Sequence, residues 1–194
     1  MIKSRGSLGP ILGYHGCDAS VAEDVLAGRI HLQPSKNDYD WLGNGIYFWV
    51  ESPERAWDWA SNPKGKSAAR IKNPAVVGAL IYPGRCLNLT DFGVLDEVRD
   101  AYNVMVDLRT DAQEEIPVND CESAGVFLVR RLDCAVIQTV HFLREEYGSP
   151  AYDSVYGVFE EGKALYPGAG FKAKTHVQIA VRETACIAGY FRVP

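Results

Sequence analysis

The segment Gly43-Asn-Gly-Ile-Tyr-Phe-Trp-Val50 decides the fold, because a glycine-containing polar loop leads directly into an apolar, aromatic strand. Successive strand residues point to opposite faces of a sheet, so Tyr47 faces away from its neighbours Ile46 and Phe48. Tyr47 can therefore offer a ring and a hydroxyl to a flat ligand, although a core tyrosine fits the pattern equally well. A Rossmann fold is excluded, because its glycine fingerprint follows a strand and these glycines precede one.

A short apolar strand is expected upstream at residues 10–14, and it runs into His15 and Gly16. Asp18 or Ser20 then caps a helix. Gly16 has no Cβ, which lets a ligand approach the backbone closely, and this context suits a binding site. A lone histidine is more often a hydrogen-bonded core residue, so the case for His15 depends on its neighbours.

Further elements follow from the apolar periodicity along the chain. Ser52 and Pro53 form an N-cap and first-turn pair, so a helix is expected through Ala60. Residues 91–147 are expected to form a helical insertion, in which two apolar helical patterns flank a polar segment. Strands are expected at 76–82, 85–89, 154–159, 176–181 and 187–191. Strands, a helical middle and further strands together predict the α+β class.

Composition limits the class of protein. The 194 residues are 47% hydrophobic and 23% charged, which is typical of one globular domain spanning 1–194. A net charge of −5 gives no overall attraction to nucleic acid or to anionic membranes. The five cysteines lack zinc-site spacing, so reduced thiols and no metal are expected. No signal-peptide pattern and no membrane-length apolar run occur, which favours a cytoplasmic protein. We expect a monomer or weak oligomer.

Three motifs in order resemble the poly(ADP-ribose) polymerase family, the diphtheria-toxin-like class of ADP-ribosyltransferases. They are Tyr14-His15-Gly16, the segment from Gly43 to Phe48, and Ser52-Pro-Glu-Arg-Ala56. The resemblance continues through 76–80 and 152–157, and leaves 91–147 as an insertion. It implies an ADP-ribosyltransferase fold of two facing, mainly antiparallel sheets with flanking helices, and NAD bound in the cleft between them.

The resemblance also implies roles for individual residues. His15 and Gly16 would hold the nicotinamide ribose and amide of NAD, and Tyr47 would stack on the nicotinamide ring. Asn44 and Gly45 would line the same cofactor site. A cationic nicotinamide suits an aromatic face, which agrees with a tyrosine at this position. NAD would be a co-substrate, and no metal is implied.

The third family position, a glutamate at the start of a late strand, differs in this chain. Alignment places Gln178 there, and a small slip would offer His176 instead. Glu160 and Glu161 are further candidates for the acceptor side, although solvated turn residues fit the same pattern. An amide cannot accept a proton as a carboxylate does, so single transfer is favoured over chain elongation.

The resemblance therefore predicts a mono-ADP-ribosyltransferase that transfers ADP-ribose from NAD to a macromolecule and releases nicotinamide. The acceptor would be a protein or a nucleic acid. Two alternatives stay open: an NAD glycohydrolase acting as a toxin, and a non-catalytic module that binds NAD or ADP-ribose.

Overall fold

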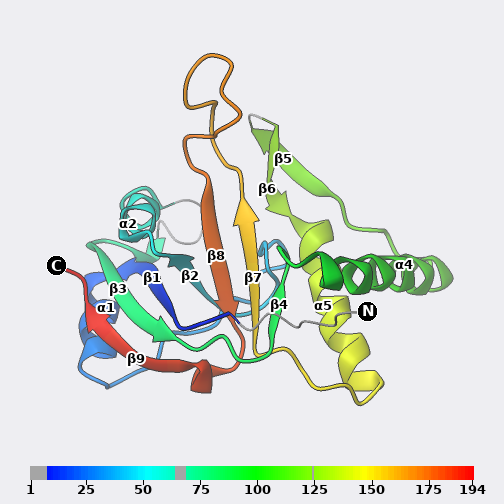
Figure 1. Ribbon diagram of the computed structural model, residues 1–194, viewed down its shortest axis with the longest axis horizontal. Helices are drawn as coiled ribbons and strands as arrows, with labels where there is room; N and C mark the ends of the chain where they lie inside the picture. Colours follow the sequence, from blue (N-terminus) through cyan, green and yellow to red (C-terminus); the bar gives the residue numbers. More distant parts are fainter. Residues whose placement is uncertain (1–7, 64–68, 124) are drawn as a thin grey trace.

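The computed structural model describes residues 8–63, 69–123 and 125–194. Seven strands form one mixed sheet in the order β4-β7-β8-β2-β1-β3-β9 (Figure 1). The strands of this sheet are β1 (Ile11–Asp18), β2 (Ile46–Val50), β3 (Pro74–Ile81), β4 (Cys86–Asn88), β7 (Ser154–Phe159), β8 (His176–Val181) and β9 (Ile187–Arg192). The α-helices are α1 (Ala19–Leu26), α2 (Pro53–Ser61), α4 (Leu95–Asp111) and α5 (Arg131–Glu146), and short 3₁₀ helices cover Phe92–Val94 and Thr184–Cys186. The predicted α+β class is confirmed.

The prediction of two separate facing sheets is wrong, because hydrogen bonds connect all seven strands. Only β4 and β7 pair in parallel; the other neighbouring strands of this sheet are antiparallel. The connection between the two halves is nevertheless short. β1 pairs with β2 only at Gly13–Val50 and Tyr14–Trp49, whereas it pairs with β3 along its whole length. The sheet is thus two half-sheets, β4-β7-β8-β2 and β1-β3-β9, joined by a two-residue ladder.

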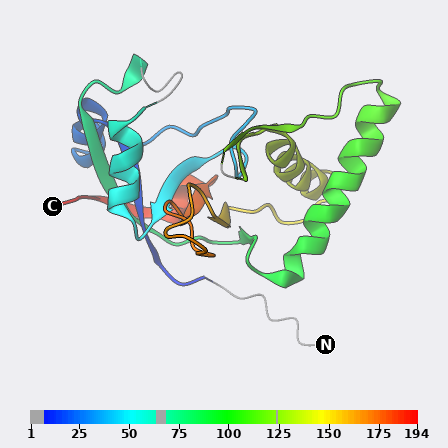
Figure 2. The same ribbon diagram turned by 90° about the horizontal axis from the view of Figure 1, so that it is seen from above.

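The two faces of the sheet carry different helices. The α1 face includes Cys17 and Phe48, and it packs against Ala22 and Val25 of α1 in one buried cluster. We call the opposite side the α2 face; it carries Gly16, Tyr47, Trp49 and Gln178, which alternation and register place together. Helix α2 covers its β1 end, where Gly16 lies against Ala56 and Ala60. Figure 2 shows α2 and the α4–α5 pair over different parts of the sheet.

Helix α5 closes the other end of the α2 face. Its Ile137 and Val140 form a second buried cluster with Val155 of β7 and Ala180 of β8, and Tyr47 packs against this cluster. Helix α4 lies on α5 through Ala101. The face between α2 and α5 is the part of the sheet that carries Trp49 and Gln178.

The predicted insertion at 91–147 is only partly helical. Between α4 and α5 the chain forms an antiparallel hairpin of β5 (Asn119–Ser123) and β6 (Val126–Arg130). β5 is almost wholly polar and exposed, so it has no apolar alternation by which a strand could be recognised. Trp41 donates a hydrogen bond to Leu128 of this hairpin, at 3.0 Å, and thereby ties it to the loop before β2.

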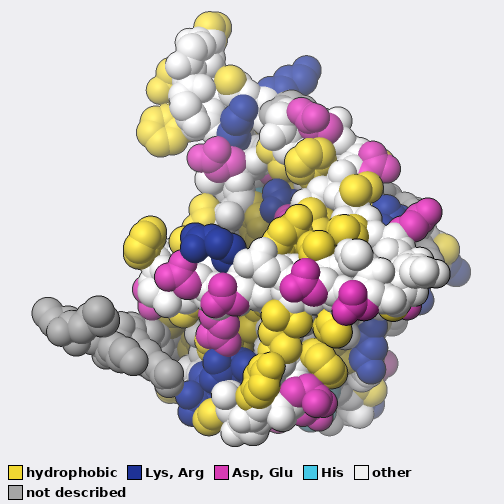
Figure 3. All heavy atoms as spheres, turned by 90° about the vertical axis from the view of Figure 1, so that its right-hand side faces the viewer, with side chains coloured by type: hydrophobic (Ala, Val, Ile, Leu, Met, Phe, Trp, Pro, Cys, Tyr) yellow, Lys and Arg dark blue, Asp and Glu magenta, His cyan; other side chains and the backbone are white. Residues whose placement is uncertain are grey.

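Other boundaries also differ from the prediction. β1 extends to Asp18, so His15 and Gly16 lie inside a strand and not after it. Asp18 does cap α1, since its carboxylate accepts a hydrogen bond from Ser20 N at 3.0 Å. After β7 a loop, 160–175, projects from the body of the molecule, and Figure 3 shows hydrophobic side chains toward its tip, where Leu165 and Phe171 are exposed.

Two further properties concern the described residues. None of their helices is both long and apolar enough to cross a membrane. Within the same residues, no three His, Cys, Asp or Glu side chains are grouped so that they could hold a metal ion. The initial residues 1–7, which bear on the signal-peptide prediction, lie outside the described part of the chain.

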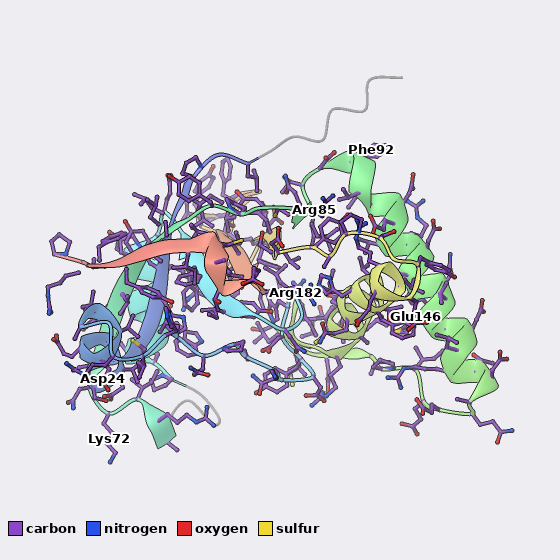
Figure 4. All side chains as sticks on the ribbon, turned by 90° about the horizontal axis from the view of Figure 1, so that it is seen from below. Asp24, Lys72, Arg85, Phe92, Glu146 and Arg182 are labelled. Atoms are coloured by element: carbon purple, nitrogen blue, oxygen red, sulfur yellow. The ribbon has the colours of Figure 1, made fainter. Side chains whose placement is uncertain are left out.

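The stability of this fold depends on pH through His141 on α5. It is buried, and neither ring nitrogen has a partner among the described residues. Burial, together with Arg182 and Arg144, lowers the pKa of His141 from 6.5 to about 3. Figure 4 shows Arg182 between the sheet and α5, which ends at Glu146.

We predict that His141 makes the fold acid-sensitive. The unfolded chain binds a proton near pH 6.5 while the folded imidazole stays neutral, so stability falls as the pH drops from 6.5 toward 3. His141→Leu removes this penalty and should be more stable than wild type by about 2 kcal/mol at pH 5. Urea unfolding should show a smaller difference at pH 7.5. An equal difference at both pH values would contradict the prediction.

Candidate functional site

His15 lies where the two half-sheets separate. Its Nδ1 is 2.8 Å from the carbonyl oxygen of Tyr47, the β2 residue that would face Gly16 if the ladder continued. A carbonyl only accepts, so Nδ1 carries the hydrogen and Nε2 of the neutral ring keeps a lone pair. Burial lowers the pKa of His15, and this keeps the ring neutral. Its side chain packs against Phe48 on the α1 face, with 5.8 Å between ring centroids.

The Gly16 backbone points into the same gap. Leu12 accepts a hydrogen bond from Glu51 N at 2.9 Å, which fixes the alternation along β1. By this alternation the N–H and C=O of Gly16 also point toward β2, beyond the last ladder pair. The missing Cβ serves packing and not ligand approach, because a Cβ would overlap with the Ala56 carbonyl of α2. What Gly16 can offer a ligand is its peptide groups.

Tyr47 is fixed by its hydroxyl. The hydroxyl donates to Gly43 O at 2.7 Å and accepts from Leu42 N at 2.8 Å. Burial and the nearby Asp40 raise the pKa of Tyr47 well above 10, so the hydroxyl stays protonated. The phenol therefore orders the loop before β2, and the half-buried ring is the part of Tyr47 that remains for stacking.

Gln178 occupies the centre of the α2 face. It lies directly across from Trp49 of β2 and Gly157 of β7. The side chain is buried, at 9% exposure, and its amide makes no hydrogen bond to the described residues. The amide is therefore mostly covered and keeps its hydrogen-bonding groups free for a ligand or water.

Three more unpartnered polar atoms surround Gln178. Among the described residues, Trp49 Nε1, Arg55 Nε and His176 Nε2 are buried and have no hydrogen-bond partner. Arg55 lies 5.8 Å from the Trp49 ring, and His176 is two residues from Gln178 on the same strand face. The concentration of donors and acceptors without partners on one face is the strongest structural sign of a ligand site in the described residues.

An ionic network borders this group. Arg55 Nη2 on α2 bonds the Glu161 carboxylate at 2.5 Å, and Glu161 lies 4.0 Å from His176 Nδ1. Asp58 joins the network through Arg55 at 2.9 Å and Lys174 at 2.7 Å. Two ion pairs therefore bind α2 to the two ends of the projecting loop.

A backbone hydrogen bond and aromatic contacts fix the position of the His176 ring. Its Nδ1 is 2.7 Å from the Lys174 carbonyl, so Nδ1 is the protonated nitrogen and Nε2 the free acceptor. Burial is the main cause that lowers the pKa of His176, which keeps the ring neutral. The ring lies 5.7 Å from Phe159 and 6.1 Å from Trp41, and Arg130 covers both of these aromatic rings.

The remaining predicted residues lie apart. Asn44 lines a cavity of about 590 Å³ between α5, α4 and the loop before β2. Gly45 pairs with Ser35, and a Cβ on it would press against the β8 backbone. Glu160 is exposed. The structure thus brings Gly16, Tyr47 and Gln178 to the α2 face. It places the His15 ring on the opposite α1 face at the β1–β2 gap, and Asn44 and Glu160 lie elsewhere.

Two residues of the site carry no role in the sequence-based prediction. Trp49 fits a packing residue by pattern, and Arg55 is a residue of the Ser52–Ala56 motif to which the resemblance assigns no role. The partner of Arg55, Glu161, is 106 positions away in the chain. The only sequence signal for the pair was the location of Glu161 at the start of the glycine-rich loop.

Comparison with known proteins identifies no family for the chain. No protein-family profile matches it, and no solved structure matches it. An uncharacterized protein of Methanocaldococcus jannaschii is 35% identical over 66 residues, which are 34% of this chain and 30% of that protein. The match spans less than a third of the relative's length, and the relative's description carries no activity.

We predict that the unpartnered amide of Gln178 lowers stability. Gln178→Met keeps the side-chain length, removes the amide and should raise the free energy of unfolding by about 1 kcal/mol. Ser154→Ala is the control, because Ser154 is equally buried but donates to Pro83 O at 2.7 Å. Loss of this hydrogen bond should lower the free energy of unfolding by about 1 kcal/mol in the same urea titration. If both variants are destabilised alike, the amide has a partner and this description of the site is wrong.

Proposed function

We propose that the protein is an NAD-dependent mono-ADP-ribosyltransferase with an ADP-ribosyltransferase fold in which the two half-sheets stay joined by a short ladder. One observation carries the proposal: buried polar groups without partners gather on the α2 face, beside the Tyr47 ring and the backbone of Gly16. These are the positions that the sequence resemblance assigns to NAD. Two half-sheets joined by a two-residue ladder also agree with a fold whose cofactor lies where two sheets meet.

The chemistry of these groups is complementary to nicotinamide and its ribose. A carboxamide has donors on nitrogen and an acceptor oxygen, and the Gly16 peptide groups directed toward β2 offer one of each in return. The Tyr47 ring supplies an aromatic face for the cationic nicotinamide. Gln178 supplies a hydrogen-bond partner for one ribose hydroxyl from the α2 face, and His15 Nε2 supplies one from the α1 side of the β1–β2 gap.

This arrangement favours departure of nicotinamide. The C1′–N bond breaks with its electron pair on nicotinamide, which leaves as a neutral molecule, and positive charge develops on the ribose. Neutral His15 and the Gln178 amide add no positive charge beside that carbon. Oriented polar groups in a largely dry site stabilise such charge more than water does. An acceptor nucleophile, from a protein or a nucleic acid, then forms the new bond to C1′.

We predict that His15 and Tyr47 are required for NAD turnover. His15→Ala and Tyr47→Ala should weaken NAD binding at least tenfold and lower nicotinamide release by about 100-fold, because both remove oriented contacts. His31→Ala is the control, since His31 is exposed and lies away from the β1–β2 gap. The measurements are calorimetry with NAD, and nicotinamide release from labelled NAD in a cell lysate, on variants whose circular dichroism matches wild type.

The products identify the reaction. Label on a macromolecule supports transfer, and mass spectrometry of that product names the acceptor. Free ADP-ribose with no labelled macromolecule would mean that the protein is an NAD glycohydrolase and not a transferase. NAD binding without nicotinamide release would mean that the protein is a non-catalytic binding module. Absence of NAD binding would overturn the proposal.

A further inference from the structure

Glu161 is a carboxylate held at the edge of the polar group around Gln178. Its Oε2 bonds Arg55 Nη2, and Arg55 extends from α2 over the Trp49 ring. On the strand side, the same oxygen is 4.0 Å from Nδ1 of His176. Glu161 therefore lies between α2 and β8, where the unpartnered atoms of Trp49, Arg55 and His176 also lie.

The position of Glu161 is determined by the backbone as well. Its carbonyl accepts from Lys174 N at 2.8 Å, which closes the base of the projecting loop. Gly162 follows with φ of +90°, a value that favours glycine and turns the chain away from the sheet. The second ion pair, Asp58–Lys174, holds the other end of the loop against α2. A solvated turn residue needs none of these constraints.

One oxygen of Glu161 remains available. Every contact described for its carboxylate involves Oε2, and Oε1 makes no hydrogen bond to the described residues. The side chain is 22% exposed, so it is reachable from the loop side while most of it is covered. Glu160, its neighbour, is exposed and makes none of these contacts.

We propose that Glu161 is the catalytic carboxylate that activates the acceptor, in place of the glutamate that Gln178 replaces. This inference rests on the proposed function. Arg55 is a positioning residue that fixes Oε2 and directs Oε1 toward the acceptor side. Recognition of the ribose and activation of the acceptor are thus divided between two chain segments, β8 and the loop after β7.

The proposed step balances. The C1′–N bond of NAD breaks and nicotinamide takes the electron pair. The acceptor O–H or N–H attacks C1′, and its proton passes to Oε1 of Glu161, which becomes a neutral carboxylic acid. Release of that proton to solvent restores the carboxylate. No redox change and no further reactant is involved.

The test compares Glu161→Gln with the matched control Glu160→Gln in the full chain. In Glu161→Gln, calorimetry should give an NAD dissociation constant within about threefold of wild type, while the rate of ADP-ribose transfer from labelled NAD to lysate macromolecules should fall about 100- to 1,000-fold. Glu160→Gln should match wild type in both. Glu161→Asp keeps the carboxylate one methylene shorter and should recover part of the rate.

Rescue by the conservative variant separates a catalytic from a structural role. Glu161→Asp, which keeps a carboxylate, should transfer ADP-ribose faster than Glu161→Gln, with NAD binding unchanged in both. Transfer by Glu161→Gln at the wild-type rate overturns the inference and leaves the proposed function standing. Equal loss in Glu161→Gln and Glu161→Asp, with weakened NAD binding in both, also overturns it, because the residue is then structural. A wild-type protein that does not bind NAD overturns the proposed function itself.

Discussion

Two residue pairs hold β1 to β2, and the positions of the His15 ring and of the Gly16 peptide groups depend on where that ladder stops. The ladder ends at Tyr14 and Trp49, and the Tyr47 carbonyl that would have continued it bonds the His15 ring instead. A side chain thus replaces a strand bond at the point of divergence. The half-sheets stay connected, and the peptide groups of Gly16 are left directed into the space between them.

The site is built at the expense of stability. Trp49, Arg55 and His176 bury polar atoms that find no partner in the described residues, whereas the hydroxyl of the buried Ser154 is bonded. Each unpartnered group opposes folding, so the fold must compensate for them through its two apolar clusters. A group of unpartnered polar atoms on one face is expected where that face binds a ligand, because such a site is not optimised for stability.

Much of the fold is predictable from local pattern. The run from Ile46 to Val50 and the Ser52-Pro53 start of α2 are local signals, and the structure has both elements, although the Ser52 side chain makes no capping hydrogen bond. β5 is not predicted from the sequence, because its residues are polar and exposed and show no apolar alternation. It forms a strand only by pairing with β6. The site is harder to predict, since Tyr47 and Gln178 share a face only through strand register. Arg55 and Glu161 meet only because α2 and the loop after β7 converge, which no spacing along the chain encodes.

The close contact of β1 with α2 has a consequence for how such sequences diverge. Gly16 leaves room only for the carbonyl of Ala56 and the methyl of Ala60. Gly16 and Ala60 therefore form a steric pair beside the Ala56 carbonyl, so a larger residue at either position lifts the helix from the strand and displaces Arg55 with it. In related chains they should therefore co-vary in size: where residue 16 is not glycine, a longer separation between strand and helix should accompany the change.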